Sequence, residues 1–140
     1  MKTLLSFLFG IFVVVFASAQ TTEETSSEKP GPRIVFGEST FEFGDINQGD
    51  QVEHTFKFEN TGTEPLILTN VQTTCGCTVP KWPREPILPG QSADIVVKFN
   101  STGKMGKVNK IIKVISNSVE PVTQISITTN ILPKSNSGTL

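Results

Sequence analysis

Two cysteines separated by one glycine are the residues of this chain most able to do chemistry. Cys75 and Cys77 are the only cysteines among 140 residues, and they lie in the stretch TTCGCTVPKWP. On a regular strand, residues two apart have Cα atoms about 6.6 Å apart, which is the upper limit for a disulfide. A bond between them therefore needs a local kink. Gly76 is the residue best able to supply one, because it has no Cβ to clash.

The pair admits three interpretations. In the first it is structural, and shapes the exit from the strand PLILTNVQ into the loop PKWPREP, where Trp82 covers one end of the domain and marks a candidate interaction loop. In the second, Cys75 and Cys77 form a redox pair, because a disulfide that closes so small a ring stabilises weakly and is reduced easily. In the third, the two thiolates hold a soft metal such as Cu(I) or Zn.

Other reactive side chains give little support to catalysis. His54 is the only histidine, and its position on the apolar face of QVEHTFKF favours a hydrogen-bonded histidine at the edge of the core. Two thiolates are too few for a closed zinc site. The carboxylate pairs Asp45 with Asp50 and Glu38 with Glu42 are expected to solvate turns and strand faces. We therefore expect no catalytic residue, no metal site and no cofactor, and classify the chain as non-enzymatic.

The beginning of the chain is typical of a secretory signal peptide. Lys2 precedes an apolar run over residues 4–16, and small residues follow at 17–19. No second long apolar stretch follows, so we expect no membrane span after cleavage. Export to the periplasm or beyond also favours an oxidised cysteine pair.

Composition divides the rest of the chain into a core and two polar flanks. The formal net charge is −1 with both signs interspersed, so there is no basic stripe to bind nucleic acid. The flanks are too polar to bury apolar surface. We assign residues 1–19 to the signal peptide, 20–32 to a flexible linker, 33–132 to one domain and 133–140 to a flexible tail.

Alternating apolar residues predict strands throughout the domain. The segments RIVF and STFEFG predict one or two short strands, and PLILTNVQ a further one. In the longer runs, one face of each strand is expected to be buried. These faces comprise Val52, His54, Phe56 and Phe58; Ala93, Ile95, Val97 and Phe99; Ile112 and Val114; and Ile125, Ile127 and Thr129.

Glycine-containing turns separate these strands. In LPGQ, Pro89 presets φ at the second position and Gly90 tolerates positive φ at the third, which is typical of a type II turn. No part of the mature chain has a helical period. The pattern predicts an all-β fold: an immunoglobulin-like antiparallel β-sandwich of about seven strands, preceded by a signal peptide.

Several motifs in this core occur in a known order. They are Phe41-x-Phe43-Gly44-x-Ile46-x-x-Gly49, Phe58-x-Asn60-x-Gly62, Pro65-Leu66, Cys75-Gly76-Cys77-Thr78-x-Pro80, Pro86-Ile87-x-Pro89-Gly90, Phe99-Asn100 and Ser116-Asn117. Together they resemble a bacterial secreted family known only as domain of unknown function fifteen seventy-three. The resemblance covers nearly all of the core and implies an immunoglobulin-like sandwich of the major sperm protein and hydin type.

The resemblance implies a binding or scaffolding role and brings no enzymatic activity with it. We therefore predict a secreted or periplasmic module with a binding or assembly role in the bacterial envelope. Its partner would be a protein recruited by strand addition at an edge strand, or through the Trp82 loop. The alternative is a thiol-disulfide redox or soft-metal-binding protein that uses Cys75 and Cys77.

Overall fold

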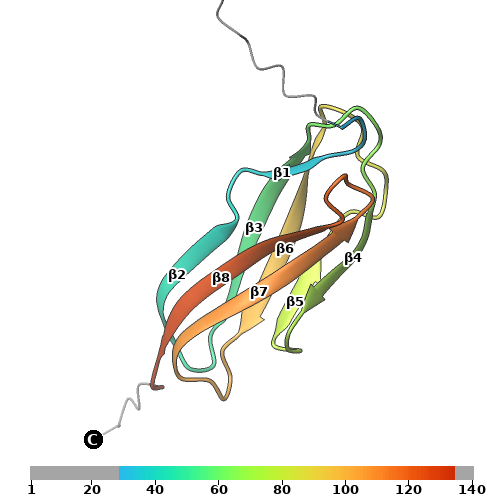
Figure 1. Ribbon diagram of the computed structural model, residues 1–140. Helices are drawn as coiled ribbons and strands as arrows, with labels where there is room; N and C mark the ends of the chain where they lie inside the picture. The colour runs from blue at the N-terminus through green and yellow to red at the C-terminus, as the bar shows by residue number, and fades with distance from the viewer. Residues whose placement is uncertain (1–28, 135–140) are drawn as a thin grey trace, which may run out of the picture.

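The computed structural model describes residues 29–134, which form eight strands and no helix (Figure 1). This confirms the all-β prediction, with one strand more than the seven expected. The extra strand is β5, which includes Pro80 and Lys81 of the segment PKWPREP that we expected to be a loop. The strands are β1 (Ile34–Phe36), β2 (Thr40–Asn47), β3 (Gln51–Asn60), β4 (Leu68–Thr73), β5 (Thr78–Lys81), β6 (Ser92–Asn100), β7 (Gly106–Ser116) and β8 (Val122–Leu132).

The strands form two four-stranded sheets that pack as a sandwich. One sheet has the order β1-β3-β6-β5 and the other β2-β8-β7-β4. The strands β1 and β2 lie in different sheets. β1 pairs with β3, and after Gly37 the chain crosses to the other sheet, where β2 pairs with β8 (Figure 1). The pair β2–β8 is parallel, while every other pair of strands in the described residues is antiparallel.

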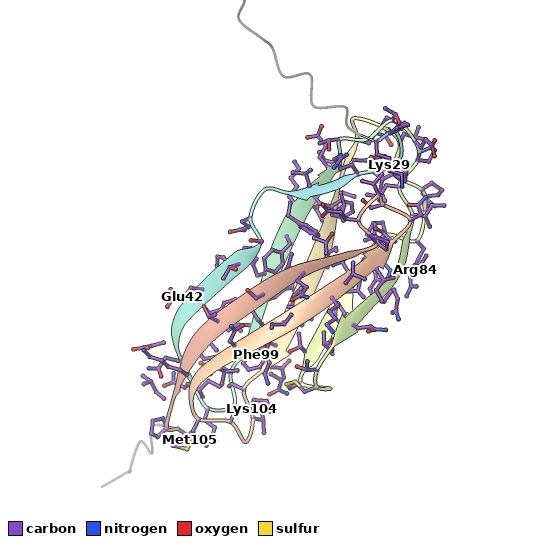
Figure 2. The ribbon with its side chains drawn as sticks, viewed as in Figure 1. Lys29, Glu42, Arg84, Phe99, Lys104 and Met105 are labelled. Atoms are coloured by element: carbon purple, nitrogen blue, oxygen red, sulfur yellow. A yellow bond between two sulfur atoms is a disulfide. The ribbon has the colours of Figure 1, made fainter. Side chains whose placement is uncertain are left out.

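The buried faces agree with the alternating pattern of the sequence. Phe56, Phe58, Ile95, Val97 and Phe99 of the first sheet are at most 1% exposed. Opposite them, the second sheet contributes its own buried row, and side chains fill the space between the two sheets (Figure 2). That row comprises Leu68, Val71, Ile112, Val114, Ile125, Ile127 and Ile131.

A buried asparagine joins three segments at the end of the sandwich where β1 begins. The Asn60 side chain is fully buried, and its Nδ2 donates to the carbonyl oxygens of Glu64 at 2.8 Å and Ile87 at 2.9 Å. Its Oδ1 accepts from the amides of Arg33 at 3.2 Å and Gly62 at 3.0 Å. All the side-chain polar groups of Asn60 are thus used by the backbone, which is how a polar residue can be buried without penalty.

Two further sequence expectations can be compared with the structure. The LPGQ turn is confirmed: Gly90 has φ +78°, and the amide of Gln91 donates to the carbonyl oxygen of Leu88 at 3.0 Å. Within residues 29–134 there is no helix long and apolar enough to cross a bilayer. The predicted signal peptide at 1–19, most of the linker and most of the tail lie outside the described residues.

Candidate functional site

The cysteine pair lies in the turn that carries the chain from one sheet to the other. β4 is the edge of its sheet and ends at Thr73, while β5 is the edge of the other sheet and begins at Thr78. The turn between them, residues 74–77, contains both cysteines and lies at the lower ends of β4 and β5 in Figure 1. The strand therefore breaks where the Cys-Gly-Cys motif begins.

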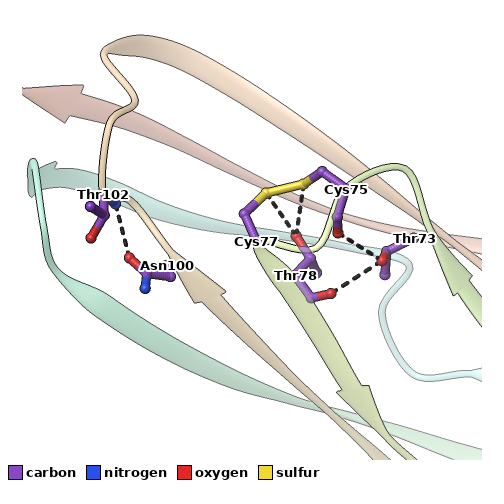
Figure 3. The surroundings of a disulfide bond; sticks show 6 residues. All are labelled: Thr73, Cys75, Cys77, Thr78, Asn100 and Thr102. Carbon is purple, nitrogen blue, oxygen red and sulfur yellow. Dashed lines mark hydrogen bonds between the residues drawn. A yellow bond between two sulfur atoms is a disulfide. The ribbon is translucent and has the colours of Figure 1, made fainter.

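Cys75 and Cys77 are joined by a disulfide (Figure 3). Their Cα atoms are 5.3 Å apart, closer than on a straight strand, so the chain is kinked as a bridge of this spacing requires. Our reason for the glycine was wrong. The φ of Gly76 lies outside the left-handed region, and a Cβ there would meet nothing within 4 Å. Backbone strain does not require glycine at position 76.

The turn is held by hydrogen bonds that do not involve sulfur. The Thr73 hydroxyl lies 3.0 Å from the carbonyl oxygen of Cys75 and 3.1 Å from that of Thr78, and donates to them. The Cys75 carbonyl also accepts from the Thr78 amide at 3.4 Å, and the Asn100 amide donates to the Cys77 carbonyl at 2.9 Å. These contacts anchor both ends of the turn through backbone carbonyls and use no sulfur atom.

The disulfide itself adds little to stability by comparison. The ring it closes spans two positions in sequence. In the loop-entropy account, a three-residue ring is worth about 1.6 kcal/mol, whereas a fifteen-residue ring is worth about 3 kcal/mol. Hydrogen bonding and core packing, not the covalent link, therefore account for most of the order of this turn.

Thr78 is the residue closest to the sulfur chemistry, and sequence reasoning did not single it out. Its side chain is 2% exposed, and its Oγ1 lies 4.0 Å from Sγ of Cys75 and 3.9 Å from Sγ of Cys77 (Figure 3). Disulfide sulfur has no hydrogen, so the hydroxyl is the donor in both contacts. The sequence did offer a signal. Thr78 follows the motif directly, and the side chain of the first residue of a strand can point back toward the turn before it.

A shallow hollow opens on one side of the disulfide. It has a volume of about 260 Å³ and is lined by Gly76, Cys77, Val79, Lys98 and Gln51, among others. The Lys98 side chain is 65% exposed, and its Nζ lies 2.9 Å from Oε2 of Glu53. A molecule in this hollow would therefore contact Cys77 and a solvent-exposed cation.

His54 does not take part in this site. Its ring stacks on Phe41, with centroids 3.5 Å apart and planes 7° apart, and contacts the edge of Phe56. Its Nε2 lies 2.6 Å from Oε1 of Glu38. The structure thus confirms a hydrogen-bonded histidine at the core edge. Within the part of the chain that the structure describes, no three His, Cys, Asp or Glu side chains are grouped so as to hold a metal ion.

The carboxylates that the sequence suggested as pairs are not brought together. Glu38 contacts His54, and Oδ1 of Asp45 accepts from Nδ2 of Asn130 at 2.9 Å. Oδ2 of Asp50 accepts from the backbone amide of Asn47 at 2.8 Å. These carboxylates serve turns and strand edges.

Trp82, the candidate interaction residue, is half-buried and packs against the core. The Arg84 guanidinium carbon lies 4.0 Å from the centre of its ring, in a cation–π contact. Its Nε1 is buried and, within residues 29–134, has no hydrogen-bond acceptor. A role of this loop in binding stays a prediction.

The structure adds a second candidate surface that sequence reasoning missed, on the open side of β3. The carbonyl oxygen of Lys57 accepts from the amide of Gly37 at 3.1 Å, so the odd-numbered residues of β3 direct their backbone groups away from β6. β1 pairs only with positions 58–60. Gln51, Glu53 and Thr55 therefore present backbone amides and carbonyls to an edge on which no strand pairs within residues 29–134. We call positions 51–55 the open β3 edge.

Comparison with known proteins identifies both a family and a fold. The family model described as "Protein of unknown function (DUF1573)" matches residues 34–131, almost all of the expected domain. No curated protein matches the chain. A protein of unknown function from Porphyromonas gingivalis W83 is 19% identical, with a TM-score of 0.63, over 72% of this chain and 47% of that one.

Other similar structures belong to unrelated proteins and are informative about the fold alone. The ASH/PapD-like domain 7 of human CEP192 is 9% identical, with a TM-score of 0.62, over 95% of this chain and 99% of that domain. The secreted serine protease VesC of Vibrio cholerae is 14% identical, with a TM-score of 0.56, over 71% of this chain and 23% of that one. The chain spans about half of the Porphyromonas protein and about a quarter of VesC. The fold is an immunoglobulin-like sandwich, as expected.

Proposed function

This chain belongs to the DUF1573 family, and from this premise we propose that it is a binding and assembly module of the bacterial envelope. The PapD-like immunoglobulin fold supports the module class, because such sandwiches present edges and loops on a rigid frame. Export to the periplasm or beyond is supported by the signal-peptide pattern at residues 1–19. In this proposal the partner is an extended segment of another envelope protein.

The open β3 edge is the observation that carries the proposal. It offers the amides and carbonyls of Gln51, Glu53 and Thr55, spaced along one strand, to an incoming chain. An extended segment can satisfy such groups by adding a strand, and the main-chain hydrogen bonds then supply affinity. The added strand would continue the line of β1, which ends where the chain crosses to the other sheet (Figure 1).

The other edge of the same sheet is protected against strand addition. In β5, Pro80 has no amide hydrogen, and the backbone amide and carbonyl of Thr78 are used by the turn. In the second sheet, the edge strand β4 carries a bulge between Leu68 and Asn70, a feature that discourages edge pairing. The open β3 edge has neither protection.

The side chains around the open edge indicate what the added strand would be like. On the inner face, Val52 is only half-buried and would gain cover from an apolar side chain. On the outer face, Glu53 and Lys98 form an exposed ion pair, with Nζ and Oε2 2.9 Å apart. The partner segment should therefore alternate, with apolar residues inward and polar residues outward.

Replacing Thr55 by proline tests this edge directly. The substitution Thr55→Pro removes an outward amide hydrogen while leaving the bonds between β3 and β6 intact, and proline is tolerated at such edge positions. Thr55→Ala is the matched control, because it changes the side chain and keeps the amide. Both variants should unfold at similar urea concentrations.

Binding is measured with envelope fractions of the source bacterium and then with the purified partner that they supply. We expect wild type and Thr55→Ala to capture the same protein, and Thr55→Pro to lose at least tenfold in affinity. Hydrogen exchange at the Glu53 and Thr55 amides should slow when the partner binds. Equal capture by both variants would exclude strand addition at this edge. No enrichment over an unrelated immunoglobulin-like domain would count against the binding role itself.

A further inference from the structure

We propose that the Cys75–Cys77 disulfide is a thiol-disulfide exchange site, which oxidises a dithiol in a protein segment that enters the adjacent hollow. The cysteine pair is joined, half-buried, and lies at one end of the sandwich (Figure 3). This activity uses different residues from the open β3 edge and does not depend on strand addition.

The first support is that the fold does not need the bond. The Thr73 hydroxyl, the Thr78 amide and the Asn100 amide hold the turn through backbone carbonyls at 2.9 to 3.4 Å. None of these contacts uses a sulfur atom, so we expect them to persist when the disulfide is reduced. The oxidised and reduced proteins can therefore share one fold, which is what a reversible exchange centre requires.

The second support is access to Cys77. The hollow of about 260 Å³ is lined by Cys77 and by Gly76, which contributes no side chain to obstruct it. A Cβ at position 76 would meet nothing within 4 Å, so glycine is not there to relieve a clash. Its absence of a side chain instead leaves the approach to Cys77 open. Lys98, 65% exposed, lines the same hollow, with its Nζ 2.9 Å from Oε2 of Glu53.

The third support is a hydrogen-bond donor for the sulfur that leaves. Oγ1 of Thr78 lies 4.0 Å from Sγ of Cys75 and 3.9 Å from Sγ of Cys77. Among residues 29–134 its hydroxyl has no other hydrogen-bond partner. Negative charge develops on the departing sulfur, and a hydrogen bond to a charged group is stronger than one to a neutral group. Thr78 is thus placed to stabilise the thiolate.

The exchange proceeds in two balanced steps. A substrate thiolate attacks Sγ of Cys77, the bond between Cys75 and Cys77 breaks, and Cys75 leaves as a thiolate that accepts the Thr78 hydrogen bond. A second substrate thiolate then attacks the substrate sulfur of this mixed disulfide and releases Cys77. The substrate dithiol loses two electrons and two protons, and the cysteine pair gains them. A disulfide of another protein or small molecule reverses these steps and restores the pair.

The test measures exchange of the purified protein with glutathione, used as the thiol probe. Reaction is stopped by acid, free thiols are alkylated, and the products are counted by intact mass. We expect reversible reduction without unfolding, and about tenfold slower exchange in Thr78→Val. Thr74→Val, at an exposed position of the same turn, is the matched control and should exchange at the wild-type rate.

Two single-cysteine variants identify the attacked sulfur. Cys75→Ser leaves Cys77 beside the hollow and should form a mixed disulfide with oxidised glutathione faster than Cys77→Ser does. The reverse order would overturn the assignment to Cys77. A disulfide that resists glutathione in the folded protein, or a Thr78→Val rate equal to that of Thr74→Val, would show a bond with a structural role only.

Discussion

Removing the side chain of Asn60 should destabilise the domain strongly, because this one residue joins three segments of the backbone. Asn60 is fully buried and makes four side-chain hydrogen bonds, with the backbone of Arg33, Gly62, Glu64 and Ile87. Each bond contributes about 1 kcal/mol net, and truncation leaves its partner without one. Asn60→Ala should therefore lower the free energy of unfolding by about 4 kcal/mol, a large share of the roughly 5–15 kcal/mol that is usual for a domain.

The single tryptophan provides the assay. Trp82 is half-buried in the native protein, so its fluorescence should change on unfolding in urea. The melting temperature should fall by at least about 15 °C, since a domain of this size loses about 4 °C or more per kcal/mol. Asn109→Ala, the same change at an exposed position of β7, is the control and should stay within about 0.5 kcal/mol of wild type.

A second substitution separates hydrogen bonding from packing. Asn60→Asp keeps the shape of the side chain and removes both Nδ2 donors, which leaves a carboxylate facing the carbonyls of Glu64 and Ile87. It should cost at least as much as Asn60→Ala at neutral pH, because a buried charge without donors is expensive. If Asn60→Asp behaved like wild type, or if Asn60→Ala cost less than about 1 kcal/mol, the buried network would not be what holds these segments together.

Further substitutions test the turns and the core edge. Gly62→Ala should destabilise severely, because its Cβ would collide with the backbone of Gly31 and Arg33, whereas Gly76→Ala should unfold at the wild-type urea concentration. The double variant Cys75→Ser, Cys77→Ser should lose at most about 1.6 kcal/mol in urea unfolding, measured against the oxidised wild type. His54→Phe should stay within about 1 kcal/mol of wild type, because it keeps the stack on Phe41, while His54→Ala should cost about 2 kcal/mol by thermal unfolding.

The strand faces could be predicted because burial alone dictates them. A strand covered on one side must alternate, and β3 does so from Val52 to Phe58 without exception. Strand pairing carries no such signature. Nothing in the residues near Gly37 specifies that β1 and β2 belong to different sheets, since both read as short alternating strands. The open β3 edge follows from that crossing, so it was equally hidden.

β5 was missed for a related reason. Proline inside a strand removes a ladder hydrogen bond, so Pro80 argues against a strand in a central position. At the edge of a sheet the argument fails, because the missing amide faces outward. The prediction for Gly76 was wrong for a different reason. A glycine beside a kink suggested that the backbone requires glycine there, whereas a Cβ at position 76 would meet no other atom within 4 Å.

The motifs shared with the family can be sorted by whether the fold uses them. Asn60 and Gly62 hold the N-terminal segment, and Asn117 accepts from the Ile67 amide at 2.8 Å and donates to the Pro65 carbonyl at 3.1 Å. Leu66 and Ile87 pair in the core. Each of these motifs has a structural purpose that its contacts make plain. The cysteine pair is different, because hydrogen bonds hold its turn without it.

The open β3 edge and the disulfide are connected by residues that pair across neighbouring strands. The two proposed sites are therefore close together, although they use different residues. Gln51 pairs with Asn100, whose amide donates to the Cys77 carbonyl at 2.9 Å, and both Gln51 and Cys77 line the hollow. A strand added beside β3 would lie about 14 Å from β5, three strand spacings away. A cysteine on a bound partner could reach Cys77 across that distance only through a loop. If the bound partner is also the substrate of the disulfide, Thr55→Pro should abolish oxidation of the partner while glutathione exchange stays unchanged. Loss of both activities would mean that the substitution had damaged the sheet.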